Sequence, residues 1–153
     1  MRLLVCGSRD WHGTWEDIAV HLPDVDDLTI IHGACSRIDS RGVQVSVDSI
    51  VAWIAPQLGH AVEAYPVNHG LDGPWPGAGP ARNRRMLAVK PDRGLAFGPL
   101  WKMDPSWKRY RPTGTGHMVG LMLAAKLPVR WILAPTLDAV DLIEIPTAPP
   151  LPV

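Results

Sequence analysis

Short apolar runs alternate along the chain with longer segments in which apolar residues recur every three to four positions. This alternation predicts βα units around a parallel sheet. The expected strands are residues 2–6, 28–32, 60–67, 94–98 and 128–133, with a further edge strand at residues 141–145. We therefore expect an α/β protein in three layers, with a central parallel sheet of about five strands flanked by helices.

Helical spacing and helix-ending residues place the expected helices between these strands. The expected helices are residues 15–21, 43–54, 80–89 and 115–126. The Gly/Pro-rich segment 68–80 is expected to be a loop, and residues 146–152, "PTAPPLP", to be disordered or polyproline II. The pattern predicts one domain over residues 1–134 and a Pro-rich tail, with the edge strand, over residues 135–153.

The composition allows one hydrophobic core and favours no charged macromolecular partner. The chain has 153 residues, of which 46% are hydrophobic, and its fifteen basic residues balance fifteen acidic ones. No apolar run is long enough to span a bilayer, and the N-terminus turns polar too soon for a signal peptide, so we expect a cytoplasmic protein without a membrane partner. Cys6 and Cys35 form no CxxC pair, which predicts free thiols and no metal site. Seven tryptophans in so short a chain make a homo-oligomer a reasonable expectation.

Glycine, hydroxyl and arginine residues follow several of the expected strands. In a doubly wound sheet, the carboxyl ends of the strands and the nearby helix N-termini bind ligands. Glycine lets backbone N–H groups approach an anion, hydroxyls add donors, and arginine binds phosphate with two parallel hydrogen bonds. The set therefore predicts a site for a phosphorylated ligand, with no required cofactor. Its candidates are Gly7, Ser8, Arg9, His32, Gly33, Asp39, Arg82, Gly98, Gly114 and Thr115.

Each candidate also has an ordinary structural role that the sequence leaves open. Gly7 and Ser8 are common turn residues, His32 could pack at a strand end, and Thr115 could only cap its helix. Asp39 could stabilise the start of a helix or accept a hydrogen bond from a ribose hydroxyl. The coincidence of the candidates at one edge of the sheet favours the ligand site.

Taken together, five motifs resemble a known family. "LLVCGSRDW", "TIIHGACSRIDS", "AGPARNRRML", "LAFG" and "GTGHMV" are similar to the YspA-like branch (DUF2493) of the SLOG superfamily, which includes the LOG phosphoribohydrolases and the DNA-processing protein DprA. The resemblance covers about residues 3–133. It implies a Rossmann-like fold that binds a nucleotide or a nucleotide-derived ligand, in a family found in bacteria and phages, and hence a bacterial or host cytoplasm. By this comparison Asn83, next to Arg82, is also a ligand-binding residue.

The chain departs from this family pattern at the second motif and after the fourth strand. Ala34, Ser36 and Arg37 stand where relatives have Gly, Arg and Gly, and residues 99–113 interrupt the glycine turn. The glutamate that follows this turn in the phosphoribohydrolases has no counterpart in "GTGHMVG". Cleavage of an N-glycosidic bond needs a placed carboxylate, so we expect sensing or sequestering rather than catalysis. If the protein is an enzyme, a phosphoribohydrolase-like nucleotide N-glycosidase with Arg82 and Asp39 as catalytic residues is the alternative.

The interrupting segment 99–113 is rich in aromatic and basic residues. Trp101 and Arg109 could bind the ligand as part of a lid over the site. A further alternative is single-stranded nucleic acid binding, because aromatic rings interleaved with cations stack bases and follow phosphates. The same tryptophans could instead pack against the domain, and the sequence leaves these alternatives open.

Overall fold

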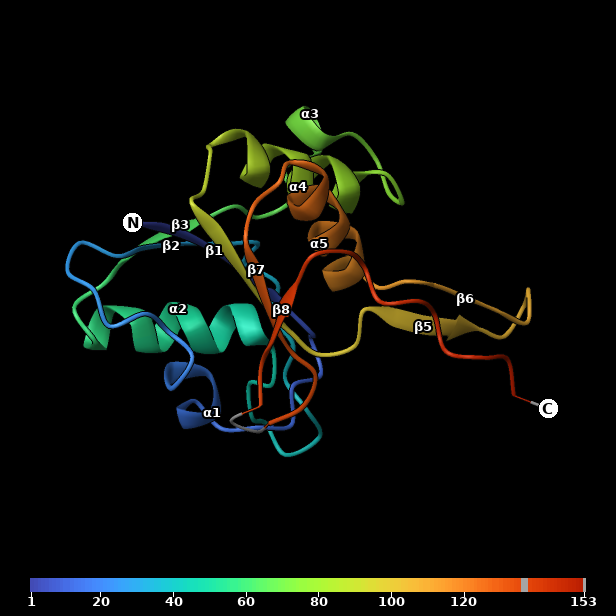
Figure 1. Ribbon diagram of the computed structural model, residues 1–153, viewed down its shortest axis with the longest axis horizontal. Helices are drawn as coiled ribbons and strands as arrows, with labels where there is room; N and C mark the ends of the chain where they lie inside the picture. Colours follow the sequence, from blue (N-terminus) through green and yellow to red (C-terminus); the bar gives the residue numbers. More distant parts are fainter. Residues whose placement is uncertain (136–137, 153) are drawn as a thin grey trace.

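A computed structural model describes residues 1–135 and 138–152. Within these residues one sheet has the strand order β3-β2-β1-β4-β7-β8, in which only β8 runs antiparallel to its neighbour (Figure 1). Its strands are β1 (Arg2–Gly7), β2 (Thr29–His32), β3 (Ala61–Ala64), β4 (Arg93–Phe97), β7 (Val129–Ile132) and β8 (Val140–Leu142). The predicted α/β fold with a central parallel sheet is confirmed, and the strand order is that of a Rossmann-like fold.

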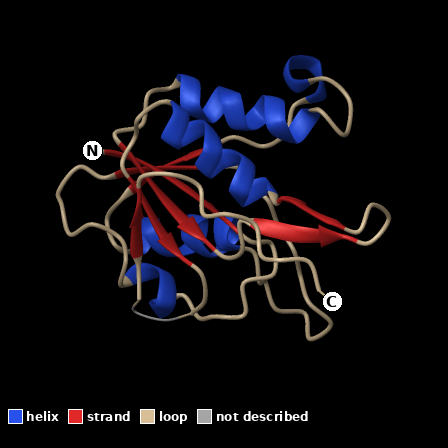
Figure 2. Cartoon of the chain, turned by 45° about the vertical axis from the view of Figure 1, so that its right-hand side comes forward, coloured by secondary structure: helices blue, strands red, loops and turns tan. Residues whose placement is uncertain are grey.

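Helices cover both faces of the sheet (Figure 2). They are α1 (Glu16–Ala19), α2 (Val47–Gln57), α3 (His69–Asp72), α4 (Ala78–Ala88) and α5 (Gly114–Ala124). Helices α1 and α2 bury their apolar sides against one face, and α4 and α5 bury theirs against the other. Along β1, Leu3 packs in the first core and Leu4 in the second, as expected of a parallel strand that is buried on both faces.

Helix α2 begins four residues later than the predicted start at Val43. Ser46 caps it, accepting a hydrogen bond from the Ser49 N–H, while the Asp39 carboxylate accepts one from the Val43 N–H. Residues 38 and 44 are joined by an isolated antiparallel bridge. Local side-chain hydrogen bonds therefore hold residues 39–43 in a turn, although Val43 fits the apolar spacing of the following helix.

The predicted loop over residues 68–80 was wrong in part, because it contains α3 and the first turn of α4. The Asn68 side chain accepts a hydrogen bond from the Gly70 N–H, and the Asp72 carboxylate accepts one from the Asn68 N–H. These two bonds stabilise a helical turn in a Gly/Pro-rich segment. Pro80 lies in the first turn of α4, where a missing N–H costs nothing.

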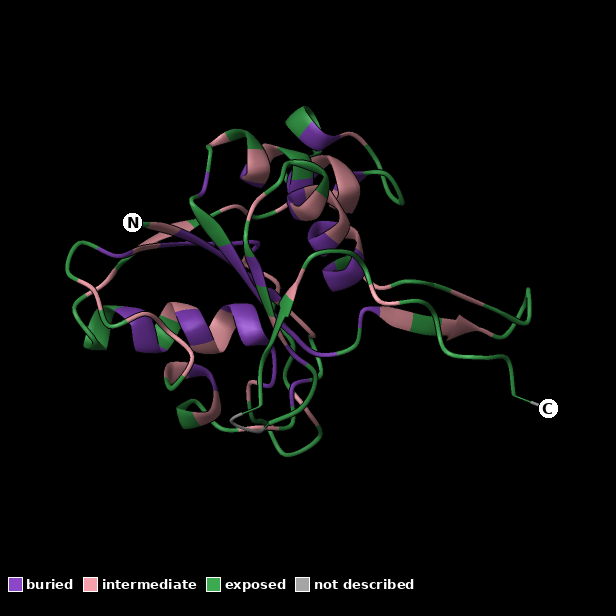
Figure 3. Cartoon of the chain, viewed as in Figure 1, coloured by how far each residue is buried: buried purple, intermediate pink, exposed green. Residues whose placement is uncertain are grey.

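The segment that interrupts the glycine turn forms a β-hairpin of β5 (Trp101–Asp104) and β6 (Arg109–Pro112). The hairpin projects from the body of the molecule, and most of its length is exposed or half-buried (Figure 3). Its two ends meet at the body, because the Thr113 N–H donates to the Leu100 carbonyl over 2.9 Å and the Thr113 hydroxyl to the Pro99 carbonyl over 2.7 Å. Gly116 allows this approach, since a Cβ there would collide with the Leu100 carbonyl oxygen.

The C-terminal tail follows β8 without forming further regular structure up to residue 152. The Trp101 indole N–H donates a hydrogen bond of 2.8 Å to the Pro146 carbonyl, which fastens the tail to the hairpin. Among residues 1–135 and 138–152, no helix combines the length and apolar character that crossing a bilayer requires.

Candidate functional site

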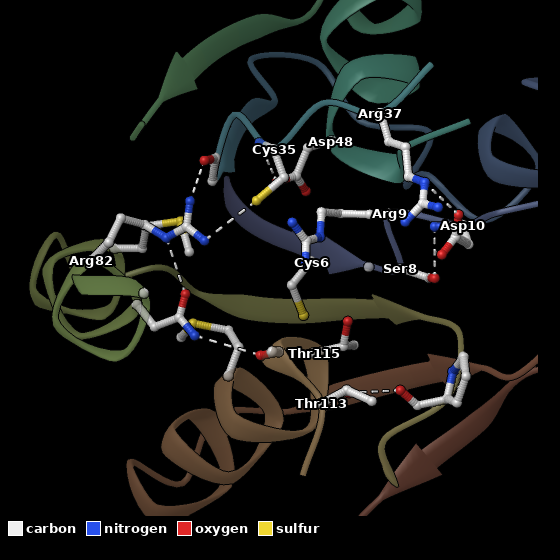
Figure 4. Close-up of a pocket in the computed structure, with 18 of the residues that line it drawn as sticks. Cys6, Ser8, Arg9, Asp10, Cys35, Arg37, Asp48, Arg82, Thr113 and Thr115 are labelled. Carbon is white, nitrogen blue, oxygen red and sulfur yellow. Dashed lines mark hydrogen bonds and ion pairs between the residues drawn. The ribbon is translucent and has the colours of Figure 1, made fainter. Parts of the chain in front are cut away.

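A cavity of about 350 Å³ opens at the carboxyl ends of β1 and β4 (Figure 4). The strand order reverses at this pair, because the chain adds β2 and β3 on one side of β1 and continues from β4 to β7 on the other. Such a reversal leaves a crevice, which is where ligands bind in open α/β sheets. The structure brings eight of the predicted residues to this cavity: Gly7, Ser8, Arg9, Gly33, Arg82, Asn83, Gly114 and Thr115.

Five predicted residues do not line the cavity: His32, Asp39, Gly98, Trp101 and Arg109. The buried His32 ring instead accepts a hydrogen bond of 3.0 Å at Nδ1 from the Ala34 N–H, and burial, followed by the charge of Arg82, lowers its pKa. Gly98 directly follows β4 with a φ of 98°, and its carbonyl accepts a hydrogen bond from the Trp131 indole N–H. These two residues therefore shape the strand ends next to the cavity.

Asp39 is paired within its own turn. Its carboxylate binds the Arg41 guanidinium at 2.8 Å, and this hydrogen bond, followed by the one from the Val43 N–H, lowers its pKa. The carboxylate is thus held ionised against Arg41 and away from the cavity.

The helix α5 presents its N-terminus to the cavity. Thr113 caps the helix by accepting a hydrogen bond of 2.9 Å from the Gly116 N–H, whereas the Gly114 and Thr115 N–H groups have no acceptor among the described residues. Thr115 as a residue is only 5% exposed, but its hydroxyl is open to the cavity and has no hydrogen-bond partner in the described part of the chain. In Figure 4 this hydroxyl points into the cavity. Two backbone donors and one hydroxyl are therefore available to an anion.

Arg82 is buried in α4, and most of its N–H donors bind other groups of the protein. Its guanidinium donates to the Gly33 carbonyl, to the Tyr65 carbonyl at 3.2 Å, to the Asn83 side chain at 3.1 Å and to the Cys35 sulfur at 3.6 Å. A guanidinium has five N–H donors, so four bonds leave about one for a ligand. The residue predicted as catalytic is mainly a clamp between α4 and the ends of β2 and β3.

Asp48 is a buried carboxylate that the sequence interpretation missed. It lies in the first turn of α2, lines the cavity and accepts a hydrogen bond of 3.0 Å from the Cys35 N–H. Burial raises its pKa, while the Cys35 N–H and the charge of Arg82 act in the opposite direction. A sequence signal existed, because Asp48 shares a helical face with the buried Val51 and Ala55.

Four cationic side chains line the cavity. Arg37 is paired with Asp10 at 3.0 Å, and Arg82 lies close enough to Asp48 to affect its pKa. Arg9 and Lys102 form no ion pair among the described residues. The cavity therefore carries about two positive charges in excess of its carboxylates.

The other lining residues come from all of its walls. They are Cys6, Asp10, Cys35, Arg37, Trp75, Gly79, Met86, Pro99, Lys102, Thr113 and Met118. Burial, as the main cause, raises the pKa of the Cys6 thiol, so this thiol is protonated and unreactive. Among the described residues, no cluster of three His, Cys, Asp or Glu residues could hold a metal ion.

The hairpin reaches the cavity only at its base. Pro99, Lys102 and Thr113 are lining residues, whereas Trp107 near the turn is 71% exposed and lies under the Arg109 guanidinium at 5.7 Å. Figures 1 and 2 show the hairpin extending away from the body. In this structure the hairpin therefore flanks the mouth of the cavity and does not cover it.

The expected resemblance to the SLOG superfamily can be tested by comparing the chain with known proteins. The family assignment stays a prediction, and the chemistry of the site rests on its own residues. Scans against family models, curated proteins and solved structures find no match to this chain.

Proposed function

We propose that the cavity binds a nucleotide or nucleotide-derived ligand through its phosphate group. One observation carries the proposal: the Thr115 hydroxyl, which has no hydrogen-bond partner in the described part of the chain, faces the cavity beside the free Gly114 and Thr115 N–H groups of the α5 N-terminus. These donors are open to the cavity, and a helix N-terminus with free N–H groups favours a bound anion. The position at the strand-order reversal supports the same conclusion.

The charge of the cavity selects the kind of anion. Arg9 and Lys102 provide two cations without ion-pair partners in the described structure. A phosphate monoester carries about −1.5 to −2 charges at pH 7 and offers three acceptor oxygens. It therefore balances this excess, whereas a carboxylate would balance about half of it.

The size of the cavity limits the rest of the ligand. Its volume of about 350 Å³ lies at the lower end of the range for small-molecule sites, roughly 300 to 1,000 Å³. This volume suits one nucleotide unit better than a dinucleotide. The ligand that we propose is a mononucleotide or a compound of similar size.

Calorimetric titration with AMP and with inorganic phosphate tests the proposal. Replacing Thr115 with valine keeps the side-chain shape and removes the hydroxyl, so we expect AMP affinity to fall roughly tenfold or more, as for a hydrogen bond to a charged group. Thr29→Val, at the opposite end of the sheet, is the matched control and should bind as the wild type does. Failure of the wild-type protein to bind AMP or phosphate, or equal binding by Thr115→Val, would overturn the proposal.

A second candidate is hydrolysis of the N-glycosidic bond, and Asp48 is the observation that favours it. The cavity holds a buried carboxylate whose pKa is raised by burial, as general acids in active sites have. Release of base from nucleoside monophosphates, followed by chromatography, measures this activity. If it exists, Asp48→Asn should abolish it and Asp39→Asn should leave it unchanged; absence of any base release in the wild-type protein refutes the candidate.

A further inference from the structure

Trp75 is exposed but lines the cavity. Its side chain is 63% exposed, and it lies just before α4, in the Gly/Pro-rich segment. Single exposed apolar side chains are common on protein surfaces. An exposed indole on the wall of a ligand cavity, however, has a surface that a ligand can cover.

Neighbouring groups fix the position of this indole. The His69 ring meets it edge to face, with centroids 5.8 Å apart and an interplanar angle of 76°. The indole also lies against the first turn of α4, since a Cβ at Gly79 would stand 3.4 Å from its Cζ3 atom. An aromatic ring that is held before binding loses little conformational freedom when a ligand contacts it.

The wall formed by α4 offers few free hydrogen bonds. The Asn83 amide is engaged by the Arg82 guanidinium, by His117 at 3.0 Å and by the Gly114 carbonyl at 3.5 Å. Met86, which also lines this wall, is apolar. The donors without protein partners are instead gathered at the α5 N-terminus and at Arg9 and Lys102. A ligand therefore meets a polar wall at one part of the cavity and an aromatic, apolar wall at another.

We infer that Trp75 is the stacking platform for a nucleobase, so that the ligand is recognised as a nucleotide and not as a sugar phosphate. This inference rests on the proposed phosphate site, which would hold the other end of the same ligand. Sugar hydroxyls would need hydrogen-bond partners, whereas a flat ring needs only an exposed aromatic face. Stacking tolerates all bases, because every base has a π-face, so purine and pyrimidine nucleotides should both bind.

The experiment compares AMP and CMP with ribose 5-phosphate, which shares their phosphate and ribose but has no base. Wild-type protein should bind either nucleotide roughly 5- to 150-fold more tightly than ribose 5-phosphate, the range expected for one stacked base. Trp75→Ala should remove this preference and leave the affinity for ribose 5-phosphate unchanged, and Trp75→Phe should retain part of it. Trp53→Ala is the matched control, because Trp53 is 57% exposed on α2 and does not line the cavity.

The outcomes of this experiment distinguish failure of the Trp75 platform from failure of the proposed phosphate site. Equal binding of nucleotides and ribose 5-phosphate by the wild-type protein would refute the platform and leave the phosphate site standing. A loss of affinity for all three compounds in Trp75→Ala would also refute it, because stacking acts on the base alone. If none of the compounds binds the wild-type protein, both the phosphate site and the platform fail.

Discussion

Replacing Arg82 with methionine should destabilise the protein, because this arginine is a structural clamp in the wall of the cavity. Methionine keeps much of the aliphatic volume, so the change removes chiefly the hydrogen bonds. The carbonyls of Gly33 and Tyr65 would lose their guanidinium donor. Each unsatisfied buried polar group costs about 1–3 kcal/mol, and since the Tyr65 carbonyl is only partly buried, we expect a loss of about 2–4 kcal/mol in the free energy of unfolding.

Urea denaturation followed by circular dichroism measures this loss. With a slope of about 2 kcal/mol per molar urea, the midpoint should fall by roughly 1–2 M. Arg84→Met is the matched control: Arg84 is exposed on the same helix, so its replacement should change the free energy of unfolding by less than about 0.5 kcal/mol. If the free energy of unfolding of Arg82→Met lies within that margin of the wild-type value, Arg82 is not a structural clamp. Its guanidinium would then be available to bind the ligand.

An independent substitution tests the same contact from the other side. A Cβ at Gly33 would stand 2.6 Å from the Arg82 Cζ atom, so Gly33→Ala must displace the guanidinium. We expect a destabilisation similar to that of Arg82→Met. The double variant should lose much less than the sum of the two single changes, since both act on one contact.

Three further changes test other parts of the structure. Ala34 has a φ of 53°, so Ala34→Gly should raise the free energy of unfolding by up to about 1 kcal/mol, and a urea midpoint below that of the wild type would contradict this. The hydrogen bond from Arg85 lowers the pKa of Asp72 from 3.8 to about 2. The stability from this pair is therefore present above about pH 4 and lost as the pH falls toward 2, and Asp72→Asn should flatten the dependence of the urea midpoint on pH in that range. Trp101→Phe removes the hydrogen bond to Pro146, so limited proteolysis should cut residues 146–152 faster, while AMP affinity stays unchanged.

The elements that the sequence predicted well are those buried on both sides. An apolar run such as residues 2–6 leaves little choice but a central parallel strand, and the structure has β1 there. The two glycine-containing corners after β1 and before α5 were also predicted to meet, because strand ends in such a sheet share one edge. Gly7 and Thr115 do line one cavity.

The errors occurred where local hydrogen bonds override the apolar pattern. Val43 fits the helical spacing of α2, yet the Asp39 carboxylate binds its N–H and keeps it in a turn. Asp39 was predicted as a site residue because a carboxylate near a helix start can either stabilise the helix or bind a ligand. The residue spacing does not distinguish these two roles. Asp48 was overlooked because carboxylates are mostly exposed on helix surfaces, whereas this one is 4% exposed.

Because the base of the β5–β6 hairpin is closed by a hydrogen bond, the residues beyond it can be replaced by another sequence. The hairpin leaves the body at Leu100 and returns at Thr113, and the hydrogen bond between these two residues joins its ends whatever lies beyond them. A segment with joined ends can be shortened, lengthened or replaced at a small entropic cost, because chain closure depends only weakly on length. Its base also carries Lys102 into the cavity wall. The hairpin is therefore a suitable position for grafting a fluorescent reporter. The reporter would lie a few residues from the cavity and would not be part of the central sheet.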